Sequence, residues 1–119
     1  MYHERPYQTL IVWKESHQLC LRIYKLSAEF PSYEKFRLMD QLCRAAASVP
    51  ANIAEGSGKQ SKKERFRFYE IAGCSLEETH YHLLLARDLH YIDQEAFNEM
   101  NDHIQRISYL LVRLRGSLG

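Results

Sequence analysis

Apolar residues recur at alternating steps of three and four positions in four separate segments of the chain. These segments run from Val12 to Phe30, from Met39 to Ile53, from Tyr69 to Ala86 and from Phe97 to Leu114. Such spacing gathers apolar side chains on one face of an α-helix. The pattern therefore predicts four amphipathic helices that share one core.

Proline, glycine and capping residues mark where these helices begin and end. The signals are Pro31 followed by Ser32, Gly56 and Gly58, Ser61 with Glu64 three residues later, and Asp93. They predict helices at about residues 9–30, 33–56, 62–90 and 94–115. Because the connections are short, neighbouring helices should be antiparallel. The predicted fold class is all-α, an antiparallel up-down-up-down four-helix bundle in one domain spanning residues 1–119.

Composition agrees with a helical domain and limits what its charge can do. The 119 residues are 45% apolar and 26% charged, and they include only 5 glycines and 3 prolines. This is ordinary globular usage with too few turn-forming residues for a sandwich or barrel. The net charge of +1 is far from that of a strongly basic nucleic-acid-binding domain. Any such binding must rest on a local patch.

The three cysteines, Cys20, Cys43 and Cys74, are widely spaced and form no C-x-x-C pair. Such spacing favours free thiols that act as small apolar residues in a reducing compartment. The N-terminal MYHERPYQTL lacks the apolar core of a signal peptide, and no apolar run reaches the length of a membrane span. We expect a cytoplasmic protein that has no membrane partner.

Many large apolar residues fall outside the four stripes, and a lone bundle cannot hide all of them. They are Trp13, Tyr24, Phe36, Phe66, Phe68, Tyr81, Leu84, Leu85, Tyr109, Leu110 and Val112. Exposed apolar patches usually mark interfaces. The simplest expectation is a homo-oligomer.

The second helix contains an unusual motif, Pro50, Asn52, Glu55 and Gly56. Pro50 removes a backbone donor and crowds the preceding turn, which costs about 3 kcal/mol in a helix interior. A bend there would position the next corner and help to form a subunit interface, where a buried Asn52 can fix register. The alternative is that Pro50 only shapes the bundle and Asn52 only bonds a freed carbonyl.

Positive charge gathers directly after this motif. We call Lys59, Lys62, Lys63, Arg65 and Arg67 the basic corner. Arg44 is a further candidate, and aromatic residues lie between the cations. Basic and aromatic side chains together can hold phosphates and stack on bases, so RNA or DNA is the predicted partner. The alternative is a solvated helix start.

The sequence contains few features of a catalytic site. Di-iron bundles use Glu-x-x-His on two helices. Glu77 and His80 have that spacing, but Glu99 and His103 are four residues apart. No nucleophile elbow or complete phosphate-binding loop is present. We expect no enzyme activity, no cofactor and no metal. A pure protein-interaction module and a metal-dependent bundle enzyme are the alternatives.

Several strings resemble a known bacterial four-helix-bundle family. They are Val12-Trp13-Lys14, Leu42-Cys43-Arg44-Ala45-Ala46, SVPANIAEG from Ser48 to Gly56, and Ile71-Ala72-Gly73-Cys74-Ser75-Leu76-Glu77-Glu78. The family includes the 23S rRNA intervening sequence proteins, and it is similar to the accessory variability determinant proteins of diversity-generating retroelements. The resemblance covers almost the whole chain.

This resemblance implies an antiparallel bundle that assembles into a barrel-like homopentamer with a central channel. In the retroelement members the bundle binds nucleic acid and a reverse transcriptase, whereas the intervening-sequence members have no established biochemical role. The sequence does not decide between these subgroups. One departure is Gly58-Lys59-Gln60, where the family commonly carries an early arginine. Lysine keeps the charge but loses the forked hydrogen bonding to phosphate.

Overall fold

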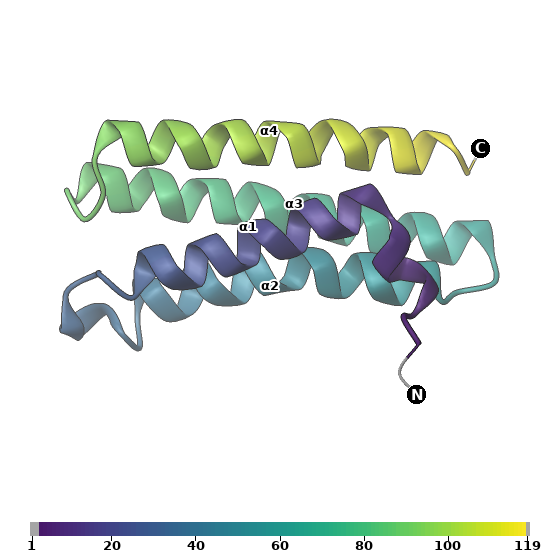
Figure 1. The fold of residues 1–119 in the computed structure, drawn as a ribbon, viewed down its shortest axis with the longest axis horizontal. Helices are drawn as coiled ribbons and strands as arrows, with labels where there is room; N and C mark the ends of the chain where they lie inside the picture. The colour runs from purple at the N-terminus through teal and green to yellow at the C-terminus, as the bar shows by residue number, and fades with distance from the viewer. Residues whose placement is uncertain (1–2, 119) are drawn as a thin grey trace.

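The fold is an all-α four-helix bundle, as the hydrophobic pattern predicts. A computed structural model describes residues 3–118. Its helices are α1 (Ile11–Ser27), α2 (Leu38–Ser57), α3 (Lys62–Asp88) and α4 (Gln94–Gly116), with short 3-10 turns η1 (Pro6–Thr9) and η2 (Ser32–Glu34). Successive helices run in opposite directions (Figure 1). Each helix packs against two others, and α4 closes the bundle beside α1.

The second helix begins at Leu38, so the predicted start at residue 33 is wrong. Ser32 makes no capping hydrogen bond with its side chain; instead, the Leu38 N–H donates to Glu34 Oε1 over 3.3 Å. The buried Glu34 carboxylate also accepts a 2.6 Å hydrogen bond from Tyr91 Oη. That bond raises the pKa of Tyr91. The first helix is also shorter than expected, since it ends at Ser27.

The other helix ends follow the predicted signals. Ser61 Oγ accepts from the Glu64 N–H at 3.0 Å, and Asp93 Oδ1 accepts from the Ala96 N–H at 2.7 Å. Gly58 is the C-cap of α2. After α3 the chain turns at His90, whose φ is 64°, and the Tyr91 N–H bonds the Ala86 carbonyl. This is the hydrogen bonding of a helix terminus that usually carries glycine.

The core consists of the predicted stripes. Of the residues that carry the three-and-four spacing, Leu26, Met39 and Leu114 are half-buried. The others are buried: Val12, Ser16, Leu19, Ile23, Phe30, Leu42, Ala46, Val49, Ile53, Tyr69, Ala72, Leu76, Thr79, Leu83, Ala86, Phe97, Met100, Ile104, Ile107 and Leu111. The two buried Ser and Thr hydroxyls that lie on the stripes are satisfied within their own helices. Thr79 Oγ1 donates to the Ser75 carbonyl, and Ser16 Oγ donates to the Val12 carbonyl. None of the helices in residues 3–118 combines the length and hydropathy that crossing a bilayer requires.

Candidate nucleic-acid interface

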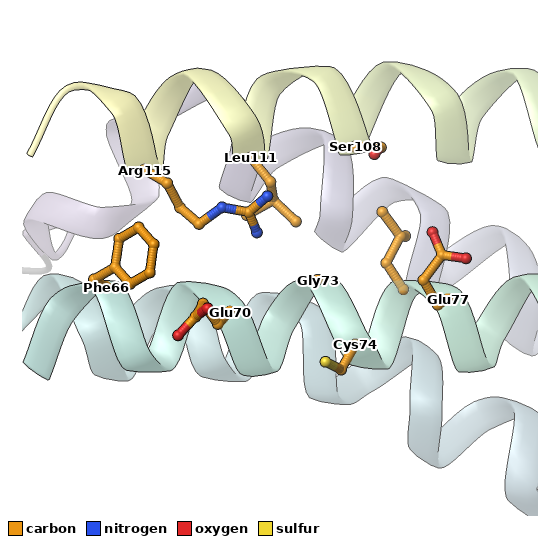
Figure 2. A pocket seen from close by; sticks show the side chains of 9 residues that line it. Phe66, Glu70, Gly73, Cys74, Glu77, Ser108, Leu111 and Arg115 are labelled. Carbon is orange, nitrogen blue, oxygen red and sulfur yellow. The ribbon is translucent and has the colours of Figure 1, made fainter.

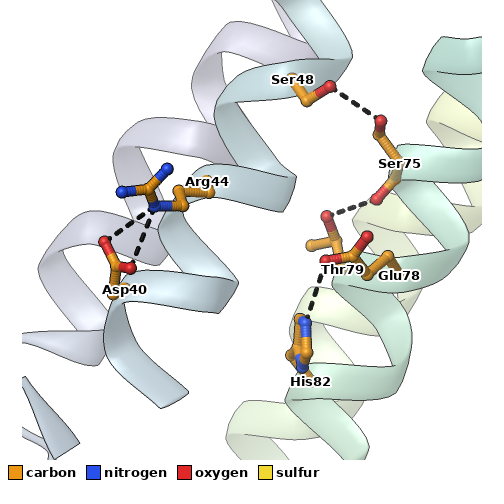
Figure 3. Close-up of polar contacts among 7 residues, drawn as sticks. All are labelled: Asp40, Arg44, Ser48, Ser75, Glu78, Thr79 and His82. Atoms are coloured by element: carbon orange, nitrogen blue, oxygen red, sulfur yellow. Dashed lines mark hydrogen bonds and ion pairs between the residues drawn. The ribbon is translucent and has the colours of Figure 1, made fainter. Parts of the chain in front are cut away.

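The polar motif of α2 joins this helix to α3. The helix continues through the buried Pro50. Asn52 Nδ2 donates to the Ser48 carbonyl at 2.8 Å and contacts Ser48 Oγ at 2.9 Å. Ser48 Oγ in turn lies 2.8 Å from Ser75 Oγ on α3 (Figure 3). The half-buried Asn52 therefore organises contacts within one chain.

Gly56 allows α2 and α3 to approach closely at the end of the seam between them. A Cβ atom at this position would lie 2.8 Å from Tyr69 Cε1 and 2.9 Å from Phe68 Cβ. A larger residue would therefore require the two helices to separate or these side chains to move. Glu55 beside it is exposed. Thus Asn52 and Gly56 lie on or near this seam. Pro50 is buried within α2, and Glu55 faces solvent.

Side-chain contacts fix the connection from α2 to α3. Ser57 Oγ donates to the Ile53 carbonyl at 2.8 Å and lies 2.9 Å from Tyr69 Oη. Arg65 Nε donates to the Lys59 carbonyl at 2.6 Å. Arg65 is half-buried, so this member of the basic corner holds the loop as well as contributing charge.

Three cations of the basic corner are exposed and available. Lys62, Lys63 and Arg67 lie in the first two turns of α3. Among residues 3–118, no acidic side chain forms an ion pair with any of the three. The amino end of α3 adds partial positive charge to theirs, and Glu64 in the first turn offsets part of it. The result is a small local cationic surface on a nearly neutral protein.

Lys59 and the nearby aromatic residues are only partly available. The Lys59 ammonium lies 5.2 Å from the centre of the Phe68 ring, which is itself half-buried. Tyr69 is buried, whereas Phe66 is exposed. Of the three aromatic residues predicted to lie between the cations for base stacking, Phe66 alone can stack on a ligand from solvent.

Arg44 does not join the basic corner. It precedes the end of α2 by thirteen residues, which is about 20 Å along the helix axis. Its Nε atom bonds both carboxylate oxygens of Asp40, at 3.0 and 3.1 Å (Figure 3). Arg44 therefore lies away from the corner, and its part in nucleic-acid binding stays a prediction.

Sequence reasoning missed an aromatic group at the same end of the bundle. η1 folds back onto α1 and α2, so that Tyr7 meets the Trp13 ring edge-on at 5.1 Å. His17 stacks on Trp13 with ring centres 5.0 Å apart. Tyr7 also lines a pocket of about 230 Å³ together with Arg65 and Tyr69. No spacing in the sequence indicates this approach, because it depends on the return of η1.

The histidines considered for a metal site have other partners. The His80 ring packs edge-on against Phe97, with ring centres 5.7 Å apart. His103 lies in the seam between α1 and α4, where Nε2 is 3.0 Å from Glu15 Oε1 and Nδ1 is 2.8 Å from Arg22 Nη1. Within residues 3–118, no three His, Cys, Asp or Glu side chains converge as metal ligands.

The contacts of His103 define its protonation state. Arginine only donates hydrogen bonds, so Nδ1 accepts from Arg22, and the single ring proton is on Nε2, facing Glu15. Burial lowers the pKa of His103, and the Arg22 cation lowers it further, while Glu15 opposes both effects. The imidazole is therefore neutral and serves as a bridge between α1 and α4.

A comparison with known protein families agrees with the described bundle. The family model for the 23S rRNA-intervening sequence protein matches residues 8–113. The chain belongs to this family. A crystal structure of an S23 ribosomal protein family member of unknown function from Bacteroides thetaiotaomicron is similar to it, with 28% sequence identity and a TM-score of 0.79. The similarity covers 88% of this chain and 98% of that one.

No curated protein matches this 23S rRNA-intervening sequence family member. The names of the family and of the similar structure specify no enzymatic activity. The chemistry of its surface is therefore the main guide to function.

Proposed function

We propose that this family member is a non-enzymatic, homo-oligomeric helical scaffold that binds nucleic acid through the basic corner. The observation that carries the proposal is a group of three exposed cations at the amino end of α3, Lys62, Lys63 and Arg67. None of them forms an ion pair with an acidic side chain in the described part of the chain. Phosphate contacts of this kind dominate the affinity of proteins for nucleic acid. The exposed Phe66 beside them offers a face for an unstacked base.

Exposed apolar surface supports the oligomeric part of the proposal. Six of the eleven large apolar residues outside the stripes are exposed: Tyr24, Phe36, Phe66, Tyr81, Tyr109 and Val112. The most exposed of them is Phe36, at 84%. Burial of such groups between copies would stabilise an assembly by roughly 25 cal/mol per Å² of apolar surface. Assembly would also repeat the basic corner once per subunit. A pentamer, and a reverse transcriptase as a protein partner, stay predictions from the family resemblance.

Salt-dependent binding tests the nucleic-acid proposal. Fluorescence anisotropy would follow labelled single-stranded RNA, RNA hairpin and duplex DNA from about 50 to 200 mM salt. Wild type should bind with affinity that falls linearly on a log–log plot. The variant K62Q/K63Q/R67Q should bind about tenfold or more weakly, with a smaller salt slope, because each lost phosphate contact removes released counterions. Arg65 is left unchanged because it holds the loop.

A matched control removes the same charge at the other end of the bundle. The variant K35Q/R37Q/R44Q also loses three cations, all of them exposed. It should retain most of the affinity and the salt slope of wild type. Absence of binding at the lowest salt, or equal binding by K62Q/K63Q/R67Q and wild type, would remove the nucleic-acid function and leave a protein-interaction module.

A further inference from the structure

Two outward surfaces of the bundle carry opposite charge. α1 and α3 each pack against α2 and α4, and no contact joins α1 to α3 within residues 3–118. The two helices are therefore diagonal in the bundle, and their solvent-facing sides point away from each other. One neighbouring molecule therefore cannot cover both sides; two separate copies are needed to cover them.

The α1 outer face consists of Lys14, Gln18, Leu21 and Lys25, which are spaced by four, three and four residues and are all exposed. Leu21 is half accessible, an unusual state for leucine at the centre of a helix face. No acidic residue belongs to this stripe. The one carboxylate inside α1, Glu15, turns instead toward α4, where it contacts His103 and Arg106.

The opposite surface is a groove between α3 and α4, with a volume of about 460 Å³. We call it the α3–α4 groove; its lining includes Phe66, Glu70, Cys74, Glu77, Ser108 and Arg115 (Figure 2). The two carboxylates make no ion pair among residues 3–118. Arg115 is the one cation in the lining, and its guanidinium reaches toward α3 over Gly73.

The groove also has apolar lining from Phe66, Leu76 and Leu111. Glu70 lies at its end toward the basic corner, where it shares a second pocket with Lys63 and Arg67. The groove therefore combines two carboxylates outside ion pairs with one lining cation and apolar surface. The α1 outer face offers the complement, because two lysines flank an exposed leucine.

We propose that the α1 outer face of one copy docks into the α3–α4 groove of the next copy. This inference rests on the homo-oligomerisation proposed above and specifies its interface. Lys14 and Lys25 are about 17 Å apart along α1, and Glu70 and Glu77 about 11 Å apart along α3. Flexible lysine side chains can span the difference. Leu21 would pack against the apolar lining of the groove.

Charge also determines how the copies are arranged. Two α1 outer faces would repel each other, as would the carboxylates of two grooves, so neither surface suits a symmetric self-contact. A head-to-tail contact uses one surface of each kind on every copy. Repetition of such a contact closes a ring or extends a filament.

Charge-reversed variants test the proposed interface. In K14E/K25E the α1 outer face becomes acidic, like the groove. In E70K/E77K the groove becomes basic, like the α1 outer face. Sedimentation velocity at micromolar concentration should show that each variant alone dissociates toward monomer, with a dissociation constant raised at least tenfold. An equimolar mixture of the two should associate again, since each contact between unlike variants joins opposite charges. The quadruple variant, with the charges exchanged within one chain, should also regain association.

Controls separate interface effects from folding and net charge. Far-UV circular dichroism should match wild type, because all four sites are exposed. Urea unfolding should also match at protein concentrations low enough that wild type is dissociated. R5E/R44E changes net charge as much as K14E/K25E does, at two exposed positions outside the proposed interface, and it should assemble like wild type. If wild type assembles and both charge-reversed variants keep its mass, the docking inference is overturned while the oligomeric scaffold stands. A monomeric wild type overturns both.

Discussion

The two sides of α3 contrast in how closely a neighbouring helix approaches. On the α2 side, Gly56 brings the backbone of α2 against Tyr69 and Phe68, and small hydroxyl residues complete the seam. On the α4 side, the helices leave the α3–α4 groove, with Glu70 and Glu77 facing open space. One helix therefore serves two purposes. Its closed side stabilises the fold and positions the basic corner, and its open side is left for another molecule.

The strongest test of the closed side is the substitution G56A. The added Cβ would lie under 3.0 Å from two side-chain atoms on α3, so the helices must separate or the Tyr69 ring must move. We expect a loss of about 2 kcal/mol or more in the free energy of unfolding, measured with urea. The control G116A places its Cβ where no atom lies within 4 Å, and it should cost nothing. Equal stability of the two variants would contradict a closed seam.

A smaller effect should distinguish two adjacent positions on α3. Ser75 faces α2 and bonds Ser48, whereas Cys74 faces the groove. S75A removes one hydrogen bond in the seam and should lower the free energy of unfolding by about 1 kcal/mol. C74S should change it by less than about 0.5 kcal/mol. If both variants lose the same stability, the two sides of α3 do not differ as described.

A pH titration should test the bridging role of His103 in the α1–α4 seam. The folded protein holds His103 neutral with a lowered pKa, while the unfolded chain protonates it near its ordinary value of 6.5. Below that pH the unfolded state binds the extra proton, so stability falls as pH decreases toward the folded-state pKa. The free energy of unfolding of wild type should therefore decline more steeply below pH 6.5 than that of H103Q. Parallel pH profiles would contradict the bridging role of neutral His103.

The smallest effect concerns the open side and changes no stability. Cys74 is exposed in the groove, whereas Cys20 and Cys43 are buried. A thiol reagent should modify Cys74 first, and C74S should lack the fast phase. If a second copy covers the groove, modification should slow as the protein concentration rises through the assembly range. A rate that is independent of concentration would mean that the groove stays open.

The sequence predicts the bundle well because each stripe depends on local spacing. Predictions from the sequence are wrong mainly where contacts between distant parts of the chain determine the structure. The start of α2 depends on Glu34, which is held by Tyr91, 57 residues away in sequence. Arg44 lies on α2 well before the corner and pairs with Asp40 on its own helix. Cys74 was expected to behave as a small apolar residue, and it is exposed instead.

The candidate site was only partly predictable for the same reason. Charge clustering in the sequence locates Lys62, Lys63 and Arg67, and the structure leaves all three exposed. The spacing does not reveal that Arg65 bonds the loop carbonyl of Lys59 or that Phe68 lies beside the Lys59 ammonium. Nor does it reveal the return of Tyr7 to this end of the bundle, since that depends on how η1 packs.

Sedimentation velocity of the wild-type protein at micromolar concentration tests the central claim most directly. If uncovered apolar and charged surface brings copies together, the protein should sediment as one discrete species with several times the 14.1 kDa mass of the chain. A stable 14.1 kDa species across that concentration range would contradict the account.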